Sequence, residues 1–294
     1  MNYRVQHRTR YRYSEPVSLC QNLAHLTPRE VQRQRCHHTD LMIRPHPAII
    51  SPRVDSFGNP ATFFSVQEPH TELVVTATHF IEVLAREKPV RPEQSPPWEK
   101  VRDALAMDRS PAVLEAYQFV FFSRFGRPNE DLKKYALESF TSRRSFIEAS
   151  IDLTKRIHTE FIYDTKATTV STPAEEVFKR RRGVCQDFAH VQIACLRSLG
   201  LAARYVSGYL PTDPPPGQPR LIGADATHAW VSVFCPVLGW VDLDPTNNHI
   251  PTDRHIVLAW GRDYDDVSPI KGVILGGGTH VMSASVDVVP NLCD

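Results

Sequence analysis

The sequence has little of what marks a membrane protein, a nucleic-acid binder or a secreted protein. Its formal net charge is only +1 over 294 residues, which gives no general attraction to nucleic acids or anionic membranes. No run of eighteen apolar residues occurs, so no membrane-spanning helix is expected. The basic N-terminal stretch is not followed by an apolar segment, so it lacks the pattern of a secretory signal. We expect a cytoplasmic protein with neither nucleic-acid nor membrane partners.

Closely spaced cysteine pairs are also lacking. Without an export signal or a Cys-x-x-Cys motif, a disulfide framework is not expected and reduced thiols are the default. Zinc-finger spacing is absent, and the adjacent residues Cys36, His37 and His38 are poorly placed to share one tetrahedral metal. We therefore expect neither a metal nor a cofactor. The six cysteines lie at positions 20, 36, 185, 195, 235 and 293.

Residues 1–86 predict a β-rich domain. In YRVQHRTRYRY, arginines alternate with aromatic, β-branched and histidine residues, which is the period of a strand with one buried face. Further β-branched and aromatic stretches follow, separated by turn sequences such as DSFGNP. Several short strands joined by turns favour a small antiparallel domain resembling a β-sandwich.

The rest of the chain predicts helices followed by strands, which makes the whole protein α+β. Residues 87–145 begin with the proline-rich EKPVRPEQSPPW and continue as a linker and helical segment. Residues 146–294 predict the core, with C-terminal strands included. It opens on a helical stripe through Phe146, Leu153 and Ile157 and continues with strand-like AARYVSGYL, HAWVSVF and GWVDLDP.

Cys185 lies in the first turn of a predicted helix that begins after Gly183. The free N–H groups and the dipole at a helix N-terminus favour an anion, and the arginines at 180–182 add positive potential, so both favour a thiolate. A cysteine at a helix start is nevertheless usually a packing residue. Cys195 falls within the apolar stripe of the same helix, and we interpret it as packing.

A base and an orienting group are available downstream. His228 opens the strand HAWVSVF, and Asp242 and Asp244 lie on one face of the next predicted strand. A hairpin between Phe234 and Gly239 would bring His228 close to Asp244, although Asp242 remains a competing partner. Each residue also has an ordinary structural interpretation, since Asp-Pro-Thr is a common turn opening.

Taken together, these motifs resemble a known family. GVCQDFAHVQIACLRSLGLAARYVSGYL, HAWVSVF and GWVDLDPT, in that order, are similar to the transglutaminase-like superfamily of papain-fold thiol enzymes, and especially to its bacterial cysteine-protease members with a β-rich N-terminal domain. The resemblance implies a papain-like core of helices packed on an antiparallel sheet. It also implies a catalytic triad of Cys185, His228 and Asp244. No EF-hand loop occurs, so calcium dependence is not expected.

The function implied is acyl transfer on amide or peptide bonds through a thioester, with a peptide or protein as substrate. We expect hydrolysis by a cysteine peptidase or amidase. The alternatives are protein-glutamine transamidation, a non-enzymatic peptide-binding module, and a metal hydrolase that uses the histidines. Gln186 and Tyr163 are candidate oxyanion donors beside the backbone N–H of Cys185, and Trp230 is a candidate cleft residue. The oligomeric state is not predicted.

Overall fold

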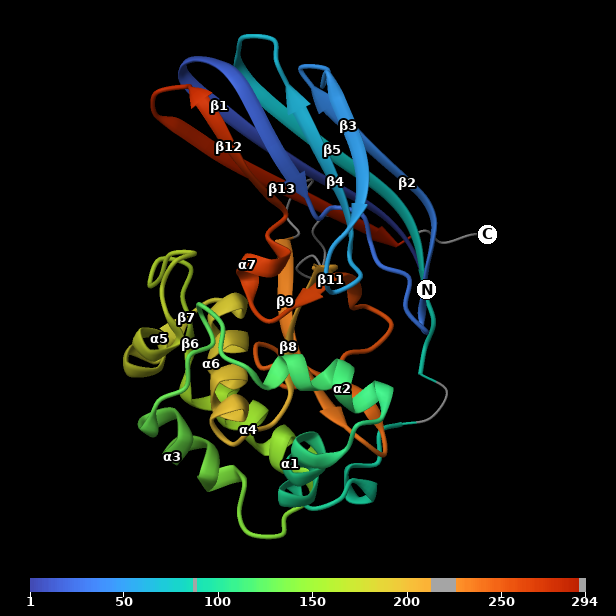
Figure 1. Cartoon of the computed structure of the whole chain (residues 1–294), viewed down its shortest axis with the longest axis vertical. Helices are drawn as coiled ribbons and strands as arrows, with labels where there is room; N and C mark the ends of the chain where they lie inside the picture. The colour runs from blue at the N-terminus through green and yellow to red at the C-terminus, as the bar shows by residue number, and fades with distance from the viewer. Residues whose placement is uncertain (87–88, 213–225, 291–294) are drawn as a thin grey trace, which may run out of the picture.

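The protein combines a large antiparallel sheet with a helical core built on a smaller sheet (Figure 1). The computed structural model describes residues 1–86, 89–212 and 226–290. Strands from both ends of the chain form the large sheet, and the middle of the chain forms the core. The expected α+β architecture is confirmed. In the part of the chain so described, no helix is both long enough and apolar enough to cross a bilayer.

Strand β1 (Asn2–Ala24) is the spine of the seven-stranded sheet. Its first half pairs with β5 and β13 and its second half with β4 and β12, and the register with β5 shifts between Arg12 and Val17. The sheet therefore curls around an interior that includes Tyr13 and Phe64. The expected sandwich-like domain is present as one curled antiparallel sheet. Its other strands are β2 (Gln34–Arg44), β3 (Ile49–Val54), β4 (Pro60–Val66), β5 (His70–Val83), β12 (Ile270–Gly276) and β13 (His280–Pro290).

The alternation predicted for the N-terminal strand is confirmed. Tyr3, Val5 and His7 are buried, whereas Arg4 and Arg8 are exposed. Burying the less polar face while solvating the guanidinium groups is what a one-sided strand requires. This face packs against part of the core, since Tyr3 and Val5 share a cluster with residues of the smaller sheet.

The last two strands depart from the predicted domain boundary. The sequence interpretation puts residues 146–294 in the core, but β13 pairs with β1 from Tyr3 opposite Pro290 to Tyr13 opposite His280, and β12 pairs further along β1. Strands β5 and β4 occupy one edge of β1, so the backbone groups along its other edge need partners too. The C-terminal strands supply those hydrogen bonds, which makes them part of the N-terminal sheet.

The segment 87–145 is more than a linker. Trp98, Leu105, Leu132 and Phe140 are buried in the same hydrophobic cluster as the central helix of the core. The segment therefore contributes helices to the core. These are η1 (Pro92–Gln94), α1 (Trp98–Met107), α2 (Pro111–Tyr117), η2 (Gln118–Val120) and α3 (Glu130–Ser139).

Helix α6 (Cys185–Ser198) is the centre of the core. Every residue from Asp187 to Arg197 is buried, so the helix is enclosed on all sides rather than along one stripe. It packs on a four-stranded sheet of order β10–β9–β8–β11. The remaining elements are α4 (Phe146–Glu160), β6 (Ile162–Tyr163), α5 (Ala174–Arg180), β7 (Arg182–Gly183), β8 (Ala203–Leu210), β9 (Ala226–Cys235), β10 (Gly239–Leu243), β11 (Ile256–Gly261) and α7 (Tyr264–Val267).

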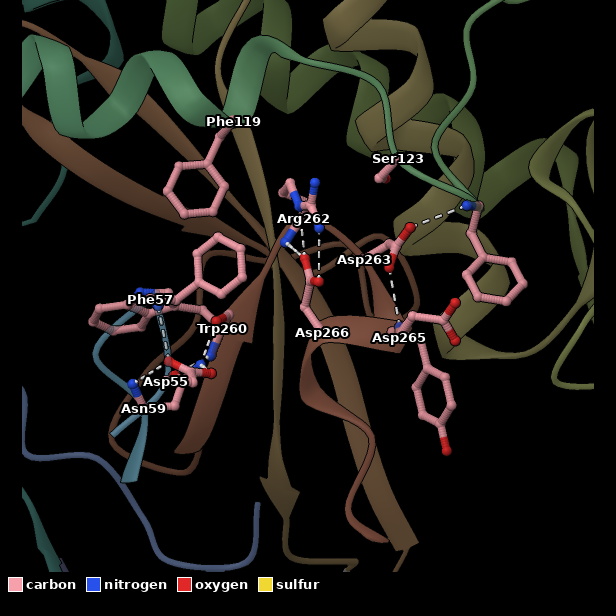
Figure 2. A network of polar contacts seen from close by, with 12 residues as sticks. Asp55, Phe57, Asn59, Phe119, Ser123, Trp260, Arg262, Asp263, Asp265 and Asp266 are labelled. Atoms are coloured by element: carbon pink, nitrogen blue, oxygen red, sulfur yellow. Dashed lines mark hydrogen bonds and ion pairs between the residues drawn. The ribbon is translucent and has the colours of Figure 1, made fainter. Parts of the chain in front are cut away.

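The turn DSFGNP joins the large sheet to the core (Figure 2). Asn59 is completely buried, and its Nδ2 donates to the backbone oxygen of Trp260 at 2.8 Å. The backbone N–H of Trp260 donates to Asn59 Oδ1 at 2.9 Å, and Asp55 Oδ2 also accepts from Asn59 at 2.6 Å. The guanidinium of Arg29 lies 3.7 Å from the centre of the Trp260 ring. One buried amide thus connects a turn of the N-terminal sheet directly to β11.

Candidate active site

Cys185 begins helix α6, as the sequence predicts. Val184 precedes it in an extended conformation, and Asp187 Oδ2 accepts from the Val184 N–H at 2.9 Å. Asp187 therefore caps the helix start, and Thr168 holds its carboxylate with a hydrogen bond of 2.6 Å. A Cβ on Gly183 would lie 2.5 Å from Asp187 Oδ2, which explains the glycine. The thiol of Cys185 is half-buried at the head of a fixed helix turn.

The hairpin of β9 and β10 brings a histidine and a carboxylate together. Gly239 pairs with Cys235 and Leu243 with Val231, so the turn lies where the sequence predicts it. His228 Nε2 lies 2.7 Å from Asp244 Oδ2, and Asp244 is completely buried. Asp242, the competing residue, pairs with Ser232 further along the hairpin and makes no such contact among the described residues.

His228 lies between a buried carboxylate and a thiol. Burial lowers its pKa, but the hydrogen bond to Asp244 and the nearby Cys185 thiol outweigh burial and raise the pKa of His228 to about 10. Because Nε2 faces Asp244, the other ring nitrogen is the one available to the thiol. These surroundings favour the imidazolium form.

Two residues at this site have no role in the sequence interpretation. Asp244 Oδ2 also accepts from His255 Nε2 at 3.1 Å and from Asn247 Nδ2 at 2.8 Å. Burial raises the pKa of Asp244, but hydrogen bonds from His228 and His255 outweigh burial and hold that pKa well below its usual range. The sequence carries a signal for the contact between Asn247 and Asp244, because an aspartate that opens a turn accepts hydrogen bonds from residues two and three positions later. His255 has no local signal, since it reaches the site only through the start of β11.

The carboxylate is anchored on its second oxygen as well. Asp244 Oδ1 accepts from the backbone N–H groups of Thr246 and Asn247 at 2.9 and 3.1 Å. The turn opened by Asp244 therefore fixes the orientation of its carboxylate. Asp244 therefore opens a turn, as the structural interpretation of Asp-Pro-Thr predicts. The hydrogen bonds of that turn also orient the carboxylate that faces His228.

The other three candidate residues lie in different surroundings. Gln186 donates its amide to the Val170 oxygen at 3.1 Å. Tyr163 is 54% exposed, and burial together with the nearby Cys185 thiol raises its pKa. Trp230 is completely buried, with its ring centre 6.0 Å from that of His228. Its ring is therefore a packing neighbour of the histidine ring.

His228, Asp244 and His255 also have the composition of a metal site. One donor atom from each residue lies within 4.8 Å of the others. Two imidazoles and one carboxylate are suitable ligands for zinc. Both imidazole nitrogens, however, already point at one carboxylate oxygen, so a cation would have to displace both hydrogen bonds.

Comparisons with known proteins match two parts of the chain to family models and nearly the whole chain to a relative. Residues 3–82 match the bacterial transglutaminase-like N-terminal region, and residues 134–245 match the transglutaminase-like superfamily. The chain is 45% identical, over 98% of its length, to the uncharacterized protein Rv2569c of Mycobacterium tuberculosis, of which it covers 92%.

Two further comparisons concern proteins with more specific names. The chain superposes over its whole length on "a Putative Cysteine Protease from Cytophaga hutchinsonii", covering 92% of that chain, with a TM-score of 0.77 and 19% identity, which shows a shared fold. It is also 34% identical to a protein-glutamine gamma-glutamyltransferase of Pseudomonas aeruginosa, over 32% of this chain and 14% of that protein.

Proposed function

Because the chain belongs to the transglutaminase-like superfamily, we propose that it is a thiol enzyme that cleaves amide or peptide bonds through a thioester on Cys185. The observation that carries the proposal is the 2.7 Å contact of His228 Nε2 with the buried Asp244 carboxylate, with the Cys185 thiol close enough to raise the pKa of His228. A binding module has no need for a histidine held between a thiol and a buried carboxylate. Enzymatic activity is also what the family membership supports.

The proposed reaction begins when the Cys185 thiol gives its proton to His228, which leaves a thiolate. The Cys185 sulfur attacks the carbonyl carbon, and the oxyanion that forms accepts from the backbone N–H of Cys185, which lies in the unpaired first turn of α6. His228 then gives its proton to the departing amine, leaving a thioester. Water attacks the thioester while His228 takes one of its protons, and the carboxylic acid leaves as the thiol is restored.

Asp244 keeps the imidazole in the required orientation and tautomer throughout these steps. Its three donors and two backbone partners hold it in place, so its role is positional and electrostatic. Of the side-chain oxyanion donors, the surroundings favour Tyr163, because the Gln186 amide already donates to Val170.

We further propose a peptide or protein substrate and a cytoplasmic location, without nucleic-acid, membrane or cofactor requirements. The described cysteines at positions 20, 36, 185, 195 and 235 are all free, which suits a reducing compartment. Fractionation of the producing cells tests the location.

The experiment that tests the reaction is mass spectrometry of the intact protein mixed with peptide p-nitrophenyl esters and glutamine-containing peptides. We expect an acyl adduct on Cys185 that disappears in Cys185→Ala. The matched control is Cys36→Ala, which removes another half-buried thiol. An adduct that survives Cys185→Ala, or release of product without any dependence on Cys185, would contradict the proposal.

Transamidation is the second candidate, and it is favoured by the similarity to the Pseudomonas aeruginosa protein. In that case an amine replaces water as the group that attacks the thioester. Adding a primary amine such as cadaverine separates the two outcomes. An amide product indicates transamidation, and free acid at every amine concentration indicates hydrolysis.

A further inference from the structure

A cavity of about 520 Å³ lies between the N-terminal sheet and the face of the core sheet that carries Arg204, Trp230 and Trp240. The opposite face of that sheet packs against α6. The segment from Glu30 to Gln34 contributes one wall and residues of β8–β11 contribute the other. None of the proposed triad residues lines this cavity. It is therefore a separate space with its own chemistry.

Several buried hydrogen-bond donors around the cavity have no partner among the described residues. These atoms are Arg33 Nη1, Arg86 Nε, Arg204 Nε and Trp230 Nε1. Guanidinium and indole nitrogens can donate but cannot accept, so all four atoms need acceptors. Buried donors without acceptors are rare and costly in folded proteins. Their concentration around one cavity indicates that an acceptor-rich ligand belongs there.

Arg204 shows what kind of acceptor is missing. Its guanidinium lies 4.1 Å from the centre of the Trp240 ring and 3.7 Å from that of Trp260, so aromatic rings cover its faces. Its edge, where the N–H donors point, is the part left for a ligand. Burial lowers the pKa of Arg204 although nearby Asp242 raises it, and no hydrogen bond or ion pair joins these two side chains in the described structure. The N–H donors of the guanidinium are thus left without a direct anionic partner among the described residues.

Three acidic residues line the cavity, and they differ in exposure. Glu30 and Glu115 are exposed, so water can solvate their carboxylates, whereas Asp242 is half-buried. The side chains of Arg33, Arg86 and Arg204 face this one half-buried carboxylate, so the inner part of the cavity remains cationic and aromatic.

We propose that this cavity binds a small organic oxyanion, a carboxylate or a phosphate ester, with an aromatic or apolar body. The oxyanion would accept from the edge of Arg204 and from Arg33 and Arg86, while the body would pack on the tryptophan rings. The volume suits a ligand of this size. His255, which donates to Asp244, also lines the cavity, so the bound ligand would touch a residue that supports the proposed triad.

Tryptophan fluorescence tests the proposal directly, because three of the four tryptophans in the chain line the cavity. The whole protein is titrated with sodium benzoate, phenyl phosphate and uncharged benzamide at constant ionic strength. We expect saturable changes with at least one of the two anions and at least about tenfold weaker binding of benzamide. The stronger of benzoate and phenyl phosphate identifies the preferred oxyanion. Benzamide binding equal to that of both anions, or no saturable change with either anion, would overturn the proposal.

Substitutions of the cavity arginines test whether the observed anion binding takes place in this cavity. Arg33 and Arg86 are half-buried and make no side-chain hydrogen bond in the described structure, so Arg33→Gln and Arg86→Gln are expected to fold. Each should weaken anion binding about tenfold, whereas Arg8→Gln, at an exposed arginine of β1, should leave it unchanged. Unaltered binding in the Arg33→Gln, Arg86→Gln double variant would refute the site. Because the readout is binding, the result does not depend on whether the thiol reaction proceeds as proposed.

Discussion

Replacing Asp244 with asparagine changes a single oxygen of the site and gives a quantitative test. The aspartate accepts hydrogen bonds from His228, His255 and Asn247 on the same oxygen, Oδ2. In Asp244→Asn, an amide nitrogen in that position would face three donors, and an amide oxygen would bring no charge. His228 therefore loses the partner that most favours its imidazolium form.

The size of the effect follows from the proton affinity of His228. Its pKa rises from the ordinary 6.5 to about 10, and each tenfold change in proton affinity corresponds to about 1.4 kcal/mol. The folded state therefore gains up to about 4 kcal/mol at pH 7. Because the nearby Cys185 thiol still favours the imidazolium, we assign about 2–3 kcal/mol of this to Asp244. Activity should fall about 10³–10⁴-fold, as is typical when a triad carboxylate becomes an amide.

The contribution of His228 to the free energy of unfolding decreases as the pH rises. A histidine whose pKa is raised in the folded state stabilises the protein fully below pH 6.5, and that contribution is lost as the pH rises through about 10. Urea unfolding should therefore show a larger gap between wild type and Asp244→Asn at pH 7 than at pH 10. Asp242→Asn, at the neighbouring carboxylate of β10, is the matched control and should keep wild-type turnover. Turnover of Asp244→Asn within about threefold of wild type, or an equal gap in stability at both pH values, would refute the reasoning.

Three further substitutions probe the surroundings. His255→Gln should lower kcat about tenfold with little change in KM, because it removes one donor to the Asp244 carboxylate; an unchanged pH profile of kcat would count against this role. Gly183→Ala should destabilise the protein by about 1–3 kcal/mol in urea unfolding, since the new Cβ would lie 2.5 Å from Asp187, and equal stability would mean that the helix cap can move. Asn59→Ala should cost about 2–4 kcal/mol by removing buried hydrogen bonds to β11, and an unfolding midpoint equal to that of wild type would contradict this.

Local patterns predict the elements of this fold well. The alternation of β1 and the turn between β9 and β10 depend on residues close in sequence, and both are as expected. The helix start at Cys185 follows from Gly183 and the capping residue Asp187, which are also local signals. Each of these features depends on the preferences of neighbouring residues, which a single sequence contains.

What the sequence cannot supply is long-range pairing. Nothing in the composition of His280–Pro290 distinguishes a strand of the core from a strand paired with β1, because any exposed strand edge can accept it. The same limit applies to His255, whose place beside Asp244 depends on how β11 lies against β8. The stacking of Arg204 between two tryptophans likewise joins three different strands.

The pairing of β13 with β1 has a consequence for synthesis of the protein. Tyr3 is synthesised long before its partner Pro290, which lies much further along the chain. Throughout that interval one edge of the longest strand in the protein stays open, and open edges are templates for pairing between chains. Nascent chains that stall before Ile270 should therefore be prone to aggregation, and this edge of the sheet can close only after β12 and β13 have been made.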